Sequence, residues 1–325
     1  MKNLLSGTHY YDEAKNAKNK FGPVVTLILF LLVFMLSQSV QSFVIMPLEL
    51  PMFREYMTAQ GIENDPGVIM SELMNFLSAT PAEYAERSII INLISTVIPA
   101  AIALLFCRFV EGRSLYSMGL VKDKAPVKYL IGIGAGAAAF SAALFVVVLS
   151  GSASFAGMGT IANPLMYAVI CIGWIIQGAE EEIVCRGWLM SSLSAKLPMW
   201  AAVLISASFF SVMHLFNGGF SLLAALNILL IGVIFSLVTI RANSLIPACA
   251  MHSVWNWIQG NFYGLPVSGM NTGSSVFRFE LGANELWTGG VFGVESGLGA
   301  TIVCVAVIAL LVFVPVRKKT ETPAA

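Results

Sequence analysis

Three adjacent glutamates interrupt an apolar stretch near the middle of the sequence. They are Glu180, Glu181 and Glu182, and Arg186 and Gly187 follow them. Because Glu182 and Arg186 are four residues apart, they can form an ion pair on an α-helix and cancel their charges. Glu181 points about 100° away from Glu182 and has no cation three or four residues further on. A carboxylate without a cation is a candidate general base or acid, so this stretch predicts one structural and one chemical glutamate.

Two of the three histidines also lie in apolar sequence. His9 stands in the polar N-terminal tail, where we expect it to be solvated, whereas His214 follows Phe210 by four residues and His252 precedes Asn256 by four. Each pair shares one face of a helix. A single histidine in a membrane helix can simply hydrogen-bond a neighbouring helix, but two of them beside buried carboxylates favour chemistry. A His and an Asn side by side could stabilise a developing oxyanion.

Chain geometry predicts that Glu181 and His214 meet. The turn between their two helices is expected at Lys196-Leu197-Pro198, and Glu181 lies 16 residues before Leu197 while His214 lies 17 after it. In an antiparallel helical hairpin the two positions would sit at the same height, within about 1.5 Å.

The elements that carry these residues are predicted to be transmembrane helices. Hydrophobic residues make up 57% of the 325 residues and charged residues only 11%, whereas soluble domains have about 25% charged residues. Lipid must therefore cover the surface. The 18 basic and 18 acidic residues balance, so nothing indicates a nucleic-acid partner.

A bilayer-spanning helix needs about 20 apolar residues. Eight stretches qualify: 24–46, 88–108, 128–150, 163–195, 199–216, 220–240, 245–259 and 296–316.

We therefore predict an all-α, polytopic membrane protein of about eight transmembrane helices with a buried site. If the N-terminus is inside, fifteen of the 18 Lys and Arg residues fall in inner segments, and only Arg54, Arg87 and Arg278 fall outside. The outer loops, 47–87 and 260–295, show no motif, although 68–87 could form an interfacial helix. The hairpin geometry puts the site about 24 Å from the turn at 196–198, nearer the outer face.

Small and sulfur-containing residues are predicted to serve packing. The five cysteines lie in apolar runs without CxxC or zinc-type spacing, so neither disulfides nor a structural metal is expected. Gly132 and Gly136 form a GxxxG pattern, which is typical of close helix packing.

The polar residues carry a family resemblance. In order and spacing they are similar to three motifs of the CAAX-protease and bacteriocin-processing (CPBP) family of intramembrane glutamate proteases, which includes the CAAX prenyl endopeptidases and the Abi proteins. The motifs are Glu181-Glu182-x-x-x-Arg186, Phe210-x-x-x-His214 and His252-x-x-x-Asn256. The similar region covers about 165–260. It divides the chain into a polar tail (1–23), N-terminal transmembrane helices with a long outer loop (24–160), a CPBP-like catalytic core (161–260), and a segment with the second outer loop, the last helix and a basic tail (261–325).

The resemblance implies an endopeptidase in the membrane. Glu181 and His214 would activate a water, and His252 and Asn256 would stabilise the oxyanion, with Glu182, Arg186 and Phe210 in supporting roles. The substrates would be membrane-associated or lipid-anchored proteins or peptides. The family also implies a site reached from the cytosol. This conflicts with the orientation above unless the turn at 196–198 protrudes beyond the bilayer or the charge-based orientation is wrong.

Three alternatives remain open from the sequence. Because HExxH is absent and no Cys or Asp joins the histidines, we expect no cofactor, but Glu181, His214 and His252 could hold zinc with an open water position. A non-catalytic binding or immunity protein would keep the same residues as a packing network. A transporter could use them as a proton relay, although no internal repeat is present. In each case the protein is a multi-pass membrane protein in contact with lipid, in the cytoplasmic membrane if the source is prokaryotic.

Overall fold

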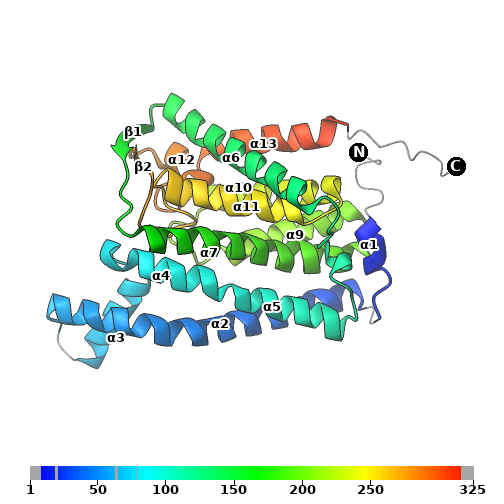
Figure 1. The fold of residues 1–325 in the computed structure, drawn as a ribbon, viewed down its shortest axis with the longest axis horizontal. Helices are drawn as coiled ribbons and strands as arrows, with labels where there is room; N and C mark the ends of the chain where they lie inside the picture. Colours follow the sequence, from blue (N-terminus) through cyan, green and yellow to red (C-terminus); the bar gives the residue numbers. More distant parts are fainter. Residues whose placement is uncertain (1–8, 19–20, 63–64, 79, 316–325) are drawn as a thin grey trace.

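The computed structural model describes residues 9–18, 21–62, 65–78 and 80–315. Within them the chain is almost entirely helical, with one small sheet (Figure 1). Predicted inner basic residues Lys2 and Lys20, and the predicted basic tail with Arg317, Lys318 and Lys319, lie outside the described residues. The elements are α1 (His9–Ala14), α2 (Pro23–Gln60), α3 (Pro66–Ser78), α4 (Ala82–Ser95), α5 (Val97–Leu105), η1 (Phe106–Val110), η2 (Tyr116–Met118), α6 (Ala125–Leu149), β1 (Ala153–Met158), α7 (Pro164–Glu182), η3 (Ile183–Met190), α8 (Ser191–Ser194), α9 (Met199–Met213), α10 (Leu222–Ala242), α11 (Ile246–Trp257), η4 (Ile258–Phe262), β2 (Phe277–Leu281), α12 (Glu285–Thr288), η5 (Val294–Ser296) and α13 (Leu298–Phe313).

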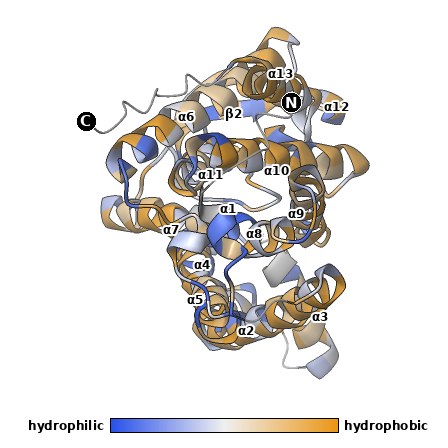
Figure 2. Cartoon of the chain, turned by 90° about the vertical axis from the view of Figure 1, so that its right-hand side faces the viewer, coloured by the Kyte–Doolittle hydropathy of each residue, from blue (hydrophilic) through white to orange (hydrophobic). Residues whose placement is uncertain are grey.

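Each predicted apolar stretch coincides with a helix or with consecutive helical segments. Among the described residues, four helical stretches are long and apolar enough to cross a membrane, namely Pro23–Gln60, Glu83–Val110, Ala125–Leu149 and Leu222–Ala242, and Met199–Met213 and Leu298–Phe313 are shorter apolar helices. Hydrophobic residues cover most of the long helices (Figure 2). Many of their side chains face outward, as Phe43 and Leu222 do at 85% and 91% exposure. The chain is thus an all-α polytopic membrane protein, and the number of crossings stays a prediction.

The first long loop is largely helical, which goes beyond the interfacial helix that the sequence allowed over 68–87. The helix expected over 24–46 continues to Gln60 as α2, and α3 and the start of α4 occupy most of the remaining loop. The reason is that apolar residues continue past Met46, and Pro47 and Pro51 are accommodated inside the helix. Gly61, with φ of 61°, ends it. At 1.5 Å per residue α2 is about 57 Å long, which exceeds the ~30 Å hydrocarbon core.

The glutamate-bearing span changes its helical form directly after the glutamates. Asn163 caps α7 by accepting hydrogen bonds from the backbone N–H groups of Leu165 and Met166, and Pro164 occupies the first turn. The α-helix ends at Glu182, and residues Ile183–Met190 form π-helical turns before α8. Such turns occur frequently at functional sites. They place Arg186 in a wider helical turn than the sequence argument assumed.

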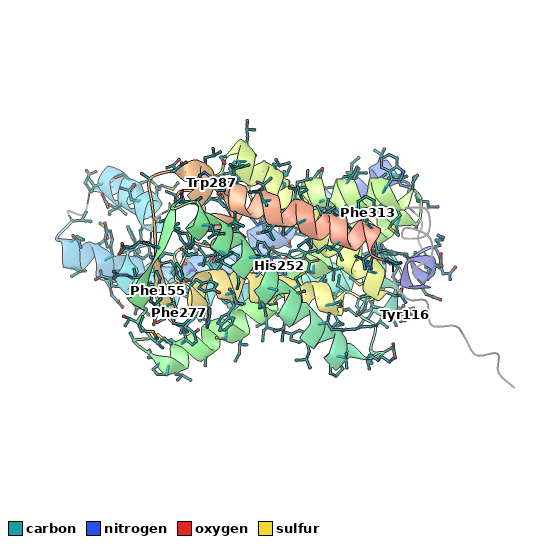
Figure 3. All side chains as sticks on the ribbon, turned by 90° about the horizontal axis from the view of Figure 1, so that it is seen from above. Tyr116, Phe155, His252, Phe277, Trp287 and Phe313 are labelled. Atoms are coloured by element: carbon teal, nitrogen blue, oxygen red, sulfur yellow. The ribbon has the colours of Figure 1, made fainter. Side chains whose placement is uncertain are left out.

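Three glycines let α11 lie very close to α6 and α7. A Cβ atom at Gly132 or Gly136 would overlap the carbonyl oxygen of Pro247 or Met251. On the other side, a Cβ atom at Gly178 of α7 would lie 2.6 Å from the backbone nitrogen of Ser253. The GxxxG pattern therefore serves the close packing that the sequence predicts. Together with Gly178, it holds α11 between α6 and α7 near His252, which lies inside the bundle (Figure 3).

The second long loop is not a simple outer loop either. β1 and β2 pair antiparallel, with an irregularity between Phe155 and Gly157. Other parts of residues 260–295 fold back onto the bundle, and Phe292, Val294 and Glu295 are buried. This fold could not be predicted, because the segment is rich in glycine and lacks a periodic apolar pattern.

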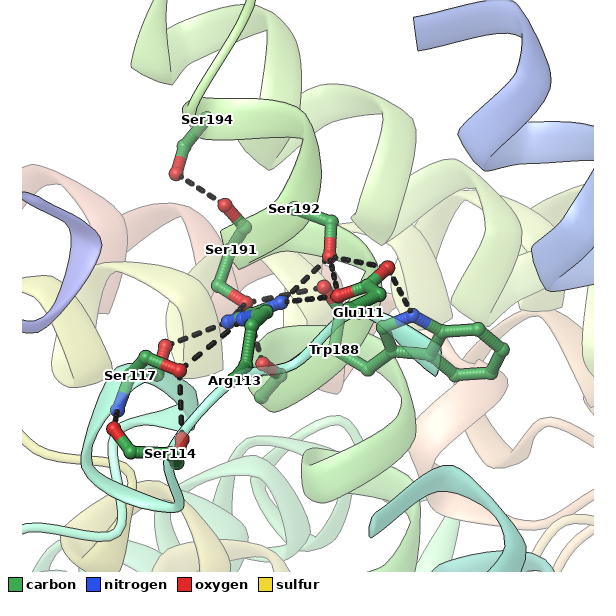
Figure 4. Close-up of polar contacts among 9 residues, drawn as sticks. Glu111, Arg113, Ser114, Ser117, Trp188, Ser191, Ser192 and Ser194 are labelled. Carbon is green, nitrogen blue, oxygen red and sulfur yellow. Dashed lines mark hydrogen bonds and ion pairs between the residues drawn. The ribbon is translucent and has the colours of Figure 1, made fainter. Parts of the chain in front are cut away.

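A buried polar cluster lies where the η1–η2 loop meets η3 and α8 (Figure 4). Arg113 forms a 3.0 Å ion pair with Glu111 and donates hydrogen bonds to the hydroxyls of Ser117, Ser191 and Ser192. The indole N–H of Trp188 donates to the other oxygen of Glu111 at 3.1 Å. Because its charges and donors are paired, this cluster fastens the two segments together.

Candidate active site

A small cavity of about 60 Å³ joins the residues that the motifs single out. Glu181 reaches it from α7, His214 from the end of α9, and His252 and Asn256 from α11. A cavity of this size has room for water molecules, which need at least about 10–15 Å³ each by this measure. The structure therefore brings the four candidate catalytic residues to one water-sized space, although they are up to 75 residues apart in sequence.

Glu182 is the acceptor of a fully buried ion pair. Arg186 Nη1 lies 2.7 Å from Glu182 Oε1, and both side chains have 0% exposure. Arg186 Nη2 also donates to the carbonyl oxygen of Gly232 at 3.0 Å. The guanidinium stands 4.5 Å from the ring centroid of Phe210, a cation–π contact. The motif residues Glu182, Arg186 and Phe210 thus form one packed unit beneath the cavity.

His252 lies between two carboxylates. Its Nδ1 is 3.1 Å from Glu182 Oε1, and its Nε2 is 3.4 Å from Glu181 Oε2. The ring stacks on Phe235, with 4.8 Å between centroids and 20° between planes. Because Arg186 and His252 share the same oxygen of Glu182, this glutamate also orients His252. From the sequence, only the contact of Glu182 with Arg186 on the same helix was predicted, and the contact with His252 was not.

His214 has a defined orientation at the end of α9. It is the C-terminal capping residue, with φ of −92° and ψ of 1°, so it stands just beyond a helix that ends at Met213, before the end of the predicted span 199–216. Its Nδ1 is 2.8 Å from the backbone oxygen of Phe210. Since a carbonyl oxygen only accepts, Nδ1 carries the proton in this contact, and Nε2 is left to accept one.

Glu181 and His214, which the sequence predicts to meet, border the same cavity. Both side chains line it, but the ion pair of Glu181 is with His252. Counting residues along the two helices predicts the heights of Glu181 and His214 but not the directions of their side chains. The site lies far from the turn at 196–198, as the hairpin geometry predicts, because His214 stands at the opposite end of α9 from that turn.

Asn256 is held by a residue that the sequence argument did not single out. Its amide Nδ2 donates to Oε1 of Gln177 at 3.0 Å. Gln177 stands four residues before Glu181 on α7 and also lines the cavity. Its spacing of four residues from Glu181 puts both side chains on the same face of α7, and this is the pattern in the sequence that could have indicated Gln177. The amide group of Asn256 has a second N–H, so it can bind another acceptor while it stays fixed.

Glu295 is a further carboxylate at the cavity. Its Oε1 accepts hydrogen bonds from the backbone N–H and the hydroxyl of Ser268, at 2.6 and 2.7 Å. Burial raises the pKa of Glu295, and the hydrogen bonds from Ser268 oppose this. Together the two residues hold the loop that covers the cavity. No motif in the sequence pointed to them.

The zinc alternative requires several metal ligands held together at the cavity. In the part of the chain that the structure describes, no group of three or more His, Cys, Asp and Glu side chains is arranged to hold a metal ion. Zinc sites use three or four such ligands. Metal independence itself stays a prediction.

Comparison with known proteins identifies the region around this cavity. Residues 162–258 match the sequence model of the family described as "Type II CAAX prenyl endopeptidase Rce1-like". This segment falls within the predicted core 161–260 and contains every motif residue, from Glu181 to Asn256. No curated protein matches the chain. The helical region that carries Glu181, His214, His252 and Asn256 is therefore the part of the chain that matches the Rce1-like type II CAAX prenyl endopeptidase family, in agreement with the resemblance of the motifs.

Proposed function

We propose that this protein is an intramembrane endopeptidase that hydrolyses peptide bonds of membrane-associated or lipid-anchored proteins or peptides. The observation that carries the proposal is the convergence of Glu181, His214, His252 and Asn256 on one water-sized cavity inside the matched domain. A family match alone supports the class of enzyme. The cavity adds a place where a water and a carbonyl group could meet beside a carboxylate.

The first chemical step would be activation of water. A water in the cavity transfers a proton to the carboxylate of Glu181, while Nε2 of His214 accepts its second hydrogen bond and orients it. The hydroxide oxygen then bonds to the carbonyl carbon of the scissile peptide. Positioning of the water and the base in one cavity supplies proximity in addition to the proton transfer.

The second step would be stabilisation and collapse of the tetrahedral intermediate. Its oxyanion accepts hydrogen bonds from the free N–H of Asn256 and from Nε2 of His252, which requires a proton on both ring nitrogens of His252. Glu181 then returns its proton to the leaving nitrogen, and the C–N bond breaks. The products are a new carboxylic acid and a new amine, and transfer of the acid proton to the amine gives a carboxylate and an ammonium group. Glu182 and Gln177 act by positioning His252 and Asn256.

No metal is needed for this sequence of steps. General-base catalysis contributes about 10²–10⁴-fold, and an oxyanion site adds on the order of 10²-fold or more. We therefore propose that activity survives exhaustive chelation. Loss of activity with a chelator, restored by stoichiometric Zn²⁺, would show instead that the enzyme is a metalloprotease.

The decisive experiment uses the purified full-length protein in lipid nanodiscs and a library of membrane peptides, with the new termini identified by mass spectrometry. We expect cleavage by the wild type and a loss of at least about 10²-fold in kcat for Glu181→Gln, which keeps the shape and removes the base. Glu280→Gln, on the exposed side of β2, is the matched control and should leave cleavage unchanged. Wild-type turnover in Glu181→Gln would refute the proposal.

A further inference from the structure

A second and much larger cavity lies beside the candidate active site. Its volume is about 950 Å³, and its walls come from α2, α3, α4 and the loop at 264–273. Most of the lining side chains are apolar, including Ile45, Phe53, Phe76 and Ile89. Cavities of about 300–1,000 Å³ are typical of ligand sites. The space is therefore large enough for several side chains of a bound molecule.

One wall of this larger cavity carries a buried carboxylate. Glu49 on α2 is only 7% exposed. Its Oε1 accepts hydrogen bonds from the hydroxyl of Ser88 and from Nδ2 of Asn92, both at 2.9 Å. Among the ion pairs of the described residues, none involves Glu49. Neutral donors thus orient the carboxylate, but no cation of the described chain compensates its charge.

An uncompensated buried carboxylate is costly. A bound molecule that brings a positive charge into the cavity would remove that cost and gain a charge-assisted hydrogen bond. Lysine and arginine side chains fit such a place, because their aliphatic stems pack on apolar walls while the charged end reaches the acid. A lipid acyl chain would fill the apolar part and leave Glu49 without a cation.

The two cavities share a wall. Met270 lines both of them, and Ser268, two residues earlier, lines the smaller one and is held by Glu295. A chain segment in the larger cavity would therefore lie next to the residue that borders the cavity of Glu181 and His214. This arrangement suits a polymer that extends from one space into the other.

We propose that the larger cavity is a substrate subsite that receives an apolar peptide segment with one Lys or Arg side chain, which pairs with Glu49. This inference rests on the proposed protease function, and it names a determinant of specificity. It places the basic side chain away from the scissile bond, on the far side of Met270.

A binding measurement tests the subsite without cleavage. Two fluorescein-labelled apolar hexapeptides, one with a central lysine and one with norleucine there, are titrated with full-length Glu181→Gln protein in phosphatidylcholine nanodiscs. Fluorescence anisotropy should show at least about tenfold tighter binding of the lysine peptide, which corresponds to ~1.4 kcal/mol. Adding Glu49→Gln should abolish the difference. Glu49→Asp, which keeps the charge, should retain part of it.

The matched control is Glu55→Gln, on the same helix but exposed and paired with Arg87. It should keep the preference for lysine. Equal binding of the two peptides before Glu49 is changed, or a preference that persists in Glu49→Gln, overturns the inference, and so does a cavity that takes up only lipid. Because binding does not depend on catalysis, a wild-type protein that prefers the lysine peptide but cleaves nothing would refute the protease function and leave the subsite standing.

Discussion

The three adjacent glutamates of α7 have three different environments. Glu182 is paired with Arg186 and contacts His252. Glu181 borders the small cavity. Glu180 is buried at 4% exposure, and its Oε1 has no hydrogen-bond partner among the described residues. Successive helical residues point about 100° apart, so one short acidic sequence supplies a structural anion, a candidate base and a third group of unassigned role.

At this scale the sequence allowed accurate prediction of contacts within a helix and missed those between distant segments. The spacing of Glu182 and Arg186 predicts their ion pair because helical neighbours follow from the repeat of the helix. The contact of His252 with Glu182 and that of Ser268 with Glu295 depend on how helices and loops pack. A single sequence contains no periodic signal for such contacts.

The first prediction at the residue scale concerns Glu182→Ala. This change leaves Arg186 as a buried cation without its anion and removes the partner of His252 Nδ1. We expect the free energy of unfolding to fall by about 3–5 kcal/mol, since this is the usual cost of breaking a buried pair. The thermal unfolding of the purified protein, followed by intrinsic fluorescence, measures the loss.

Glu181→Gln is the control for that measurement, because no arginine or lysine among the described residues pairs with Glu181. It should unfold close to the wild-type temperature while activity is lost. If Glu182→Ala were as stable as the wild type, the ion pair would not hold this helix, and the division of roles between the two glutamates would be wrong.

The helices were predicted better than the segments between them. Apolar stretches located every major helix, because the length and hydropathy that a bilayer requires are visible in sequence. The end of α2 was placed too early and the loop 260–295 was described as featureless. Helix ends depend on residues such as Gly61, and the fold of the loop depends on partners such as Phe292 that are distant in sequence.

A second prediction, at the scale of elements, is that close approach of α6 to α11 positions His252. Gly136→Ala would place a methyl group against the Met251 carbonyl, one residue before His252. Because α7 presses on α11 from the other side through Gly178, α11 cannot simply move away. We expect a loss of about 1–3 kcal/mol in stability, as for other overpacked cores, and a reduced kcat in the cleavage assay.

The chain offers a matched control on the same helix. A Cβ atom at Gly134 would meet nothing within 4 Å. Gly134→Ala should therefore retain activity and gain up to about 1 kcal/mol, because alanine favours the helix over glycine. Identical behaviour of the two variants would show that the glycines of α6 do not set the position of α11.

For the whole molecule, the structure separates two ends. α1 and the segment that joins α5 to α6 lie at one end, and β1, β2 and α12 lie at the other (Figure 1). The hydrogen bonds of Arg113 to Ser191 and Ser192 join the Glu111–Arg113 cluster to α8, just before the turn that precedes α9. The small cavity is bordered by Ser268, Met270 and Glu295, which belong to the segments near the second end. The sequence predicted this separation from the turn. It left open which end faces the cytosol, since the basic residues and the family resemblance favour opposite answers.

The last prediction is that the end of the molecule with β1, β2 and α12 faces away from the cytosol. When Arg186 is left out because it is buried in the bundle, 14 of the 18 Lys and Arg residues fall on the turn side in the eight-span arrangement, and cytoplasmic segments are the ones enriched in these residues. In a protein without its native cysteines, single cysteines would replace Lys196 in the turn, Arg278 on β2 and Ala325 at the C-terminus. Treatment of intact cells with a membrane-impermeant maleimide should label the cysteine at 278, and label those at 196 and 325 only after permeabilisation. Permeabilised cells serve as the control for reactivity at all three positions.

The reverse pattern would show that the charge-based orientation is wrong and that the cavity opens toward the cytosol. Labelling of 196 and 325 from opposite sides would contradict an even number of crossings between α9 and the C-terminus.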